Sequence, residues 1–181
     1  MKQTLRYDQL SCRLMVEGVP DVSAGQGPEA VGIITGWTLQ WLGRPELEGQ
    51  RDHLVVLLEV VLPYARHQLS GVGRSFGGST GAVSIGPAEQ ARHRLTLRSS
   101  QPGNPSLELD LDDAELADLV RVLDAARFDS RLHLPLSLPA PQPLRSRELA
   151  ERLPLQRRLA APVGGLAAVG LMAVLSFLLP P

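Results

Sequence analysis

The stretch SLELDLDDAELADLVRVLDAARF, residues 106–128, decides the fold class because a strand pattern passes directly into a helix pattern. Leucines occupy every second position from 107 to 111, which is typical of a half-buried strand. Asp112, followed three residues later by Glu115, forms a capping pattern that predicts the start of a helix. The apolar positions that follow at helical spacing are Leu116, Leu119, Val120 and Leu123. The sequence therefore predicts a strand followed at once by an amphipathic helix.

The charged residues of this helix are expected on its outer face. Asp118 and Arg121 stand three residues apart, and so do Asp124 and Arg127. Opposite charges at this spacing meet on a helix surface and stabilise it. We therefore expect two surface ion pairs on the helix.

A hairpin is predicted before the helix. The segment HRLTLRS, residues 93–99, alternates apolar and polar residues, and SQPGNP after it is a turn signal. If the leucines of the two strands pair, Arg94 lies opposite Asp110. Arg98 then lies diagonal to Glu108. Opposite charges across a sheet stabilise it, so these arginines are expected on its solvated face and not in a ligand site.

The first half of the chain has the same order of patterns. LSCRLMV at 10–16 and VGIITGWTLQWLG at 31–43 alternate like strands, and a loop rich in Gly and Pro joins them. The segment from 51 to 72 carries leucines at helical spacing. It predicts a helix that bends near Pro63 and ends at Gly71.

Two further strands are expected, at 83–85 and at 131–138, where Pro135 would confine the strand to a sheet edge. The predicted fold class is therefore α+β. Two ββα-like units form a largely antiparallel sheet with two helices on one face, and a single C-terminal transmembrane helix follows. The predicted parts of the chain are a cytoplasmic α+β domain at 1–138, a Pro-rich and basic juxtamembrane linker at 139–158 and a transmembrane anchor at 159–181.

The end of the chain predicts the anchor because no residue from Leu159 to Leu179 carries a charge. An uncharged apolar stretch of about 18 residues or more is typical of a transmembrane helix. A helix that begins at Pro162 and ends at Leu179 is roughly 27 Å long at ~1.5 Å per residue. The alternative is an apolar helix that docks in a soluble core.

Basic residues precede the anchor only on its N-terminal side; they are Arg152, Arg157 and Arg158. The positive-inside rule then places the preceding domain in the cytoplasm. The small residues that share one face of the expected helix are Ala160, Gly164, Ala168 and Ser176. Such residues let helices approach closely in lipid, so the anchor is a candidate contact with a membrane protein complex or with a second copy. The alternative is that small residues are simply common in membrane helices.

Composition limits the classes of function. The chain has 181 residues and a formal net charge of −1, so no overall field favours nucleic acid. A single cysteine, Cys12, excludes an intramolecular disulfide framework and a Cys-based zinc site. The start lacks the apolar segment of a secretory signal, so the bulk of the protein is expected to stay in the compartment where it is made.

Several residue patterns invite a chemical interpretation, and each has a structural alternative. GVGRSFGGSTG at 71–81 lacks the lysine of a phosphate-binding loop and is interpreted as a mobile loop. Cys12 lies on the apolar face of its strand and is expected to be a buried hydrophobe. Asp112 and Asp113 are explained by the helix cap, and Trp37 and Trp41 by the core.

The four histidines share no spacing typical of metal ligands; they are His53, His67, His93 and His133. The sequence therefore predicts no catalytic, cofactor-binding or metal-binding residue.

The opening of the chain resembles a known family. Tyr7, Leu10 to Leu14 and Val16 to Gly18 are similar to the start Y-x-L-P-N-C-T-L-x-L-E-G of DUF4335, a cyanobacterial family of unknown function. PYARHQLSGV at 63–72 is similar to its YAQEFLSGV, and HRLTL at 93–97 to its LHRLTV. The chain departs from the pattern at Leu10-Ser11 and in a glycine-rich insert. The resemblance implies a cyanobacterial cell with a thylakoid or plasma membrane and a C-terminal apolar helix, and it implies no activity.

Two functions from different classes are compatible with these patterns. The first is a tail-anchored interaction domain with an assembly, scaffolding or accessory-subunit role in a membrane complex. The second is a membrane-bound enzyme or ligand-binding domain whose residues converge only in three dimensions. The first is expected because the chain combines an anchor with a small domain and no evident chemistry.

Overall fold

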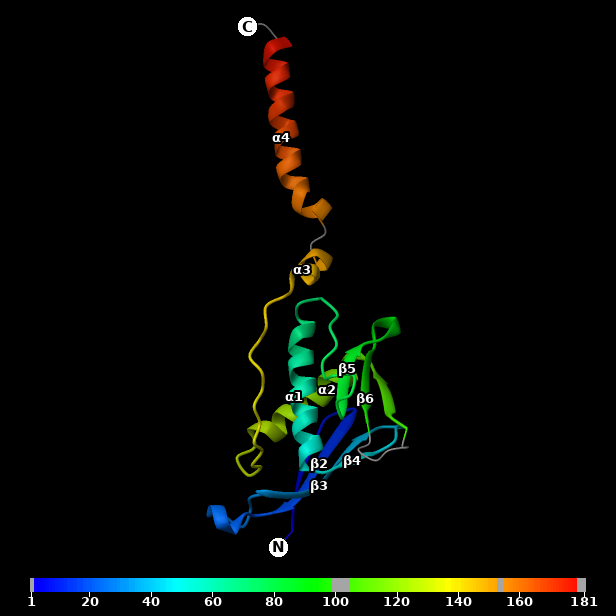
Figure 1. Ribbon diagram of the computed structural model, residues 1–181, viewed down its shortest axis with the longest axis vertical. Helices are drawn as coiled ribbons and strands as arrows, with labels where there is room; N and C mark the ends of the chain where they lie inside the picture. Colours follow the sequence, from blue (N-terminus) through cyan, green and yellow to red (C-terminus); the bar gives the residue numbers. More distant parts are fainter. Residues whose placement is uncertain (1, 99–104, 153–154, 179–181) are drawn as a thin grey trace. The chain divides into compact units, whose positions relative to one another are not determined.

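The computed structural model describes residues 2–98, 105–152 and 155–178, without the side chains of 151, 152, 155–159, 173 and 175–178. The chain divides into two compact units, Met1–Pro141 and Gln142–Pro181, and each is described by itself (Figure 1).

The first sheet is antiparallel and has the strand order β1-β2-β3-β4 (Figure 1). Its strands are β1 (Gln3–Asp8), β2 (Cys12–Val19), β3 (Ile33–Trp41) and β4 (Leu47–Gly49). Buried and half-buried residues alternate strictly along β2, as expected for a strand with one face on the core. The sequence predicted β2 and β3, whereas β1 and β4 were missed.

The second sheet has the order β5-β6-β7 and is also antiparallel. Its strands are β5 (Val83–Pro87), β6 (His93–Leu97) and β7 (Leu107–Leu111). Arg94 lies opposite Asp110 as predicted, and its Nε donates to Oδ1 of Asp110 at 2.7 Å. The same register puts Arg98 diagonal to Glu108 as predicted, but its guanidinium donates to the Gly81 carbonyl at 2.9 Å and to the Ser84 hydroxyl at 3.1 Å.

The prediction of one continuous sheet is wrong in this respect: two separate sheets are present. At the edge of β7, where a strand of the first sheet would have to pair, a side chain of the first sheet forms the hydrogen bond instead. Arg44, from the turn between β3 and β4, donates from Nη1 to the Asp110 carbonyl at 2.9 Å. The second sheet therefore meets the first through a side chain and not through a backbone ladder.

Two long helices pack against the sheets. Helix α1 (Arg51–Gln68) packs on β3 and β5, and α2 (Asp113–Phe128) packs on β1, β2 and α1. Pro63 lies inside α1, which ends close to the predicted point, and Gly71 beyond it has a left-handed φ of 70°. Short 3₁₀ turns lie at Val22–Ala24 and Glu89–Ala91.

The core lies between the sheets and these helices. Its fully buried large side chains include Leu14, Leu39, Leu57, Leu58, Tyr64, Leu95, Leu111, Leu119 and Leu123. Cys12, Trp37 and Trp41 are buried, as predicted.

The segment after α2 is extended but is not the predicted edge strand. Residues 133–145 belong to no helix or strand, and a single parallel bridge joins Leu132 to Val31. Pro135 has no N–H for a ladder, and the segment runs along α1, where Ser137 N–H donates to Glu59 at 3.4 Å. Leu134, Leu136 and Leu138 still pack on the core. The predicted alternation was correct, but its partner is a helix surface.

The second unit contains α3 (Ser146–Arg152) and α4 (Leu155–Leu178). Among the residues that the structure describes, no helix combines the length and the apolar character needed to cross a membrane. The predictions of a transmembrane anchor at 159–181 and of a single-pass membrane location are therefore wrong.

The helix also differs from the prediction in where it begins. The predicted span began at Pro162, whereas α4 begins at Leu155, so Pro162 lies inside it and its first turn takes in two arginine positions. Ala160, Gly164 and Ala168 are exposed on α4, while the side chains of the remaining predicted positions lie outside the described residues: Arg152, Arg157, Arg158 and Ser176.

The carboxylate of Asp129, just after α2, predicts an acid-sensitive contact. It accepts hydrogen bonds from Arg131, by Nη2 at 2.7 Å, and from the Tyr7 hydroxyl at 3.0 Å. The Arg131 hydrogen bond is the main reason that the pKa of Asp129 is lowered from 3.8 to about 2. Because this pKa is lower in the folded state, the carboxylate stabilises the fold above pH 3.8 and loses that effect as the pH falls towards 2.

We therefore expect the wild-type advantage over Asp129→Asn in the free energy of unfolding to be full at pH 6 and to shrink between pH 4 and pH 2. Urea denaturation followed by the fluorescence of the two buried tryptophans measures it. An advantage that is constant across this range would contradict the assignment.

Candidate interaction site at the tip of the first sheet

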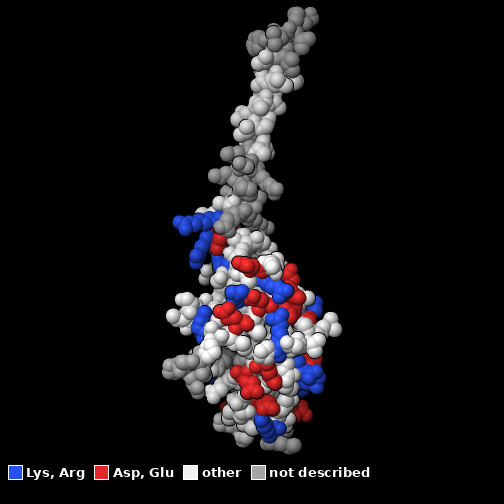
Figure 2. Space-filling view, turned by 90° about the vertical axis from the view of Figure 1, so that its right-hand side faces the viewer, with Lys and Arg blue, Asp and Glu red and all other residues white. Residues whose placement is uncertain are grey.

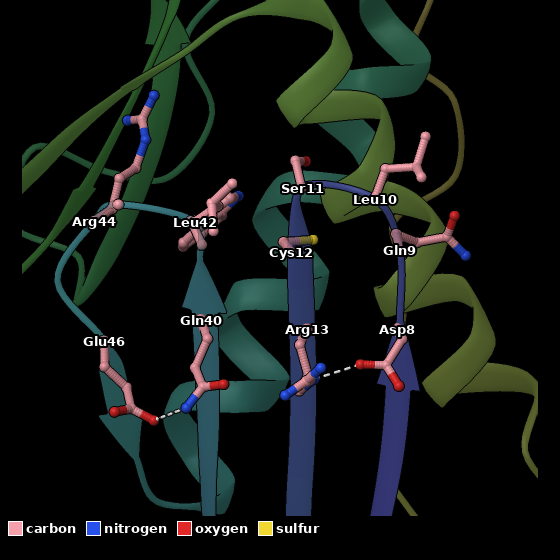
Figure 3. Close-up of a pocket in the computed structure, with 12 residues that line it drawn as sticks. Asp8, Gln9, Leu10, Ser11, Cys12, Arg13, Gln40, Leu42, Arg44 and Glu46 are labelled. Carbon is pink, nitrogen blue, oxygen red and sulfur yellow. Dashed lines mark hydrogen bonds and ion pairs between the residues drawn. The ribbon is translucent and has the colours of Figure 1, made fainter.

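Two exposed leucines stand on neighbouring turns at one end of the first sheet (Figure 3). Leu10, on the turn between β1 and β2, is 95 % exposed, and Leu42, on the turn after β3, is 91 % exposed. The Leu42 N–H donates to the Ser11 carbonyl at 3.2 Å, so the two turns are joined directly. We call these turns, residues 8–13 and 40–46, the tip.

An open pocket of about 380 Å³ lies between the two turns. Its polar side chains already pair with one another across the strands (Figure 3). Arg13 forms an ion pair with Asp8, and the Gln40 amide donates to Glu46. The Arg13 hydrogen bond is the main reason that the pKa of Asp8 is lowered.

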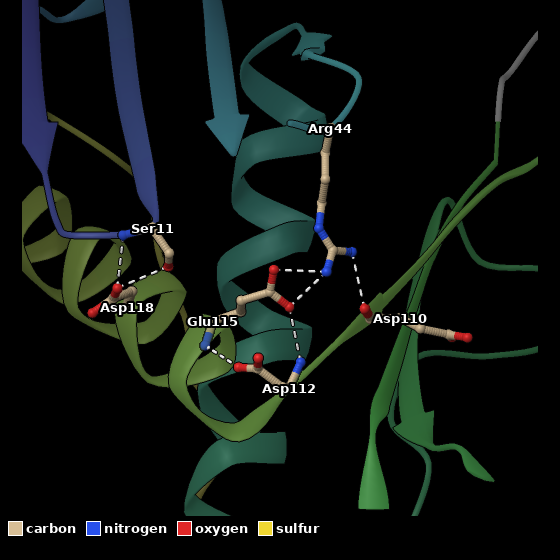
Figure 4. Close-up of polar contacts among 6 residues, drawn as sticks. All are labelled: Ser11, Arg44, Asp110, Asp112, Glu115 and Asp118. Atoms are coloured by element: carbon tan, nitrogen blue, oxygen red, sulfur yellow. Dashed lines mark hydrogen bonds and ion pairs between the residues drawn. The ribbon is translucent and has the colours of Figure 1, made fainter. Parts of the chain in front are cut away.

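The first turn is fastened by a buried carboxylate on α2. Asp118 Oδ2 accepts from the Ser11 N–H at 2.9 Å and from the Ser11 hydroxyl at 2.8 Å (Figure 4). Asp118 is only 5 % exposed, and the hydroxyl of Ser11 is the main cause that lowers its pKa. A charged group this deep requires such partners, so the contact fixes the turn on the helix.

The second turn is fastened one helical turn earlier. Arg44 Nη2 lies 2.6 Å from both carboxylate oxygens of Glu115, and Nη1 reaches the carbonyl of Asp110 (Figure 4). Glu115 also accepts from the Asp112 N–H at 2.9 Å, and the Asp112 side chain accepts from the Glu115 N–H at 2.8 Å. The predicted capping box is thus present, and its glutamate has a second role in holding the tip.

These contacts pre-organise an exposed apolar surface. Large apolar side chains in water are unfavourable, and surfaces that hold them in a fixed position are typical of interaction sites. Because the turns are already ordered, a partner that covers the leucines loses little conformational entropy in the protein. The arrangement therefore suits the recognition of another macromolecule.

The chain matches the family model for DUF4335, a domain of unknown function, over residues 5–181. The protein belongs to the DUF4335 family. No curated protein matches the chain, and no solved structure matches it. The family match confirms the resemblance in the opening strands, and it shows neither a cyanobacterial origin nor an anchored C-terminus.

Two core residues of this DUF4335 protein also line the pocket. Burial raises the pKa of the Cys12 thiol to about 12, which favours its neutral form. Trp41 is 4 % exposed, and its indole N–H is buried with no acceptor among the described residues. The tip therefore lies over two buried core residues, and the indole N–H of one of them, Trp41, has no acceptor among the described residues.

A chain of polar groups that begins at the first residue of α2, Asp113, resembles a catalytic relay. The Tyr64 hydroxyl lies 2.5 Å from His93 Nδ1, and His93 Nε2 lies 2.8 Å from Asp113 Oδ1. Tyr64 is fully buried, and burial raises its pKa to about 12. The Tyr64 hydroxyl lies in the core, and the relay joins α1, β6 and α2.

Two other candidates in this DUF4335 domain have structural explanations. Part of the glycine-rich loop is anchored, because Phe76 pairs with Ile85 and its ring lies edge-on to Tyr64 at 6.0 Å. Among the described residues, no cluster of three metal-ligating side chains is present. Over most of the first unit, the face shown in Figure 2 carries positive and negative side chains interspersed.

Asp118 is the residue that the sequence analysis placed wrongly. It does form the expected pair with Arg121, at 3.3 Å, but it points towards the core and not into solvent. Asp118 stands four residues before Val122 and eight before Ala126, both of which are fully buried. This spacing places Asp118 on the buried face of the helix, and it was the signal in the sequence that could have shown its inward position.

We expect Asp118→Ala to lower the free energy of unfolding by about 1–3 kcal/mol, because Ser11 would keep a donor without an acceptor. The matched control is Asp124→Ala on the same helix, whose pair with Arg127 is longer, at 3.8 Å, and more exposed. It should cost only a few tenths of a kcal/mol. Urea denaturation at pH 7 compares the two, and equal losses would contradict a special role for Asp118.

Proposed function

We propose that the protein is an interaction module that acts as a scaffolding or accessory subunit of a protein assembly and that the tip is its docking surface. The observation that carries this proposal is the pair of exposed leucines held in place by Asp118 and Glu115. Covering exposed apolar side chains is favourable, and the ordered turns that carry them lose little conformational entropy when a partner binds.

Helix α4 supports an assembly role independently. Its described apolar side chains are exposed on several faces, among them Leu166, Val169 and Met172. A helix that is apolar all round is typically buried in a larger structure, so α4 has a surface suited to contact with other apolar groups.

A small-ligand site at the tip receives less support. The pocket is open, and its charged groups are engaged with each other, as Asp8 is with Arg13. A ligand would have to displace these pairs before it gained any contact. A macromolecule that covers the leucines can leave them intact.

The test compares capture by tagged full-length variants in lysate of the native host. Leu10→Glu/Leu42→Glu should reduce the co-purified partner at least about tenfold, because ~1.4 kcal/mol already corresponds to a factor of ten. The control is Val22→Glu/Leu69→Glu, which alters two other exposed apolar residues, 80 % and 85 % exposed. It should leave capture unchanged.

All of these variants keep α4, so its contribution to capture is constant. Equal capture by the tip variant and the wild type would overturn the tip as the docking surface. Loss of capture with the control pair alone would also overturn it. Urea denaturation of each variant verifies that the fold is intact.

A further inference from the structure

The outer edge of β1 carries unpaired backbone groups. Gln9 N–H donates to the Cys12 carbonyl at 2.8 Å, which makes Gln9 and Cys12 a hydrogen-bonded pair of the β1-β2 hairpin. In an antiparallel ladder such pairs alternate. With the register of Tyr7 opposite Leu14, the odd residues of β1 bond to β2, and the backbones of Thr4, Arg6 and Asp8 point outward. Within the described residues these outward groups have no backbone partner.

The other sheet edges are occupied or short. Arg44 binds the Asp110 carbonyl of β7, Phe76 pairs with Ile85 of β5, and β4 has only three residues. A free edge of six residues is a template for an added strand, which main-chain hydrogen bonds hold in place. β1 is therefore the edge most open to pairing.

The charged side chains along β1 are complementary to those of an antiparallel β1 from a second copy of the chain. In an added antiparallel ladder, residues whose backbone groups point outward must face residues of the same kind. These are the even-numbered residues of β1, so the two-fold axis that relates the copies can pass through Leu5 or through Arg6 but not between them.

An axis at Arg6 puts Arg6 opposite Arg6 of the second copy, which is destabilising. An axis at Leu5 puts Lys2 opposite Asp8 of the second copy, and Asp8 opposite its Lys2. Within each chain Lys2 pairs with Glu17, and Asp8 pairs with Arg6 and Arg13, so the new contacts would extend exposed ion pairs without displacing buried ones.

We propose that two copies of the chain associate through antiparallel pairing of their β1 edges about a two-fold axis at Leu5, which gives one continuous eight-stranded sheet. Each Thr4 then forms a hydrogen-bonded pair with Arg6 of the second copy, and the lysine–aspartate pairs close both ends. This contact uses the edge of the sheet and does not depend on the tip leucines.

Disulfide trapping of the full chain tests the pairing and its register. Facing residues in a hydrogen-bonded pair have Cα atoms about 5.5 Å apart, which suits a disulfide. Thr4→Cys/Arg6→Cys should therefore form covalent dimers under mild oxidation. Arg6→Cys alone should remain monomeric on a non-reducing gel, because its partner position is Thr4. Cys12 is buried and does not compete.

A backbone variant tests the hydrogen bonds. Arg6→Pro removes only an outward N–H, which the β1-β2 hairpin does not use, and proline is tolerated at sheet edges. Arg6→Pro leaves no thiol at position 6 to face position 4 of the second copy, so disulfide trapping cannot report on this variant. Sedimentation equilibrium is therefore the measurement, with Arg6→Ala as the control that keeps the N–H.

We expect Arg6→Pro to weaken dimerisation at least about tenfold relative to Arg6→Ala, which corresponds to ~1.4 kcal/mol. Crosslinking of Arg6→Cys alone would place the axis at Arg6 and overturn the proposed register. Failure of both cysteine variants to crosslink would overturn the β1 contact. Leu10→Glu/Leu42→Glu should dimerise as the wild type does, since the tip and the β1 edge are separate surfaces.

Discussion

Everything at the tip depends on two carboxylates in the first two turns of α2. Glu115 binds Arg44, and Asp118 binds Ser11, so one helix fastens both turns of the first sheet. Arg44 also reaches the backbone of β7, which connects this end of the first sheet to the second. Without these charges the first turn would lose its hydrogen bonds to α2, and the second turn would lose its ion pair with that helix.

The start of helix α2 also explains how charged side chains can lie close to the core. Asp112 and Glu115 satisfy the free N–H groups at the helix start, and negative charge there is favourable to the helix dipole. Asp113 continues the pattern through His93 to Tyr64. Carboxylates in the first turn therefore stabilise α2 itself and connect it to β3, β6 and α1. The fold and the presentation of the two leucines share one structural support.

Several features could be predicted from the sequence because they depend on neighbours along the chain. The capping box needs residues three apart, and the register of Arg94 against Asp110 follows from the alternating leucines of two consecutive strands. The failures have a different origin. β1 has few apolar residues, and its pattern became visible only through its pairing with β2. The transmembrane prediction counted uncharged residues without knowing that α4 begins at Leu155.

The sequence by itself determined the α+β class, the two long helices, the hairpin and the burial of Cys12, Trp37 and Trp41, because periodicity and capping are local properties. Only the tertiary structure decided that the strands form two sheets and that Asp118 faces inward towards Ser11. It also decided that the leucine-rich segment after α2 lies along a helix. Each of these depends on which surfaces meet, and residues more than a hundred positions apart, such as Ser11 and Asp118, leave no local pattern of their contact.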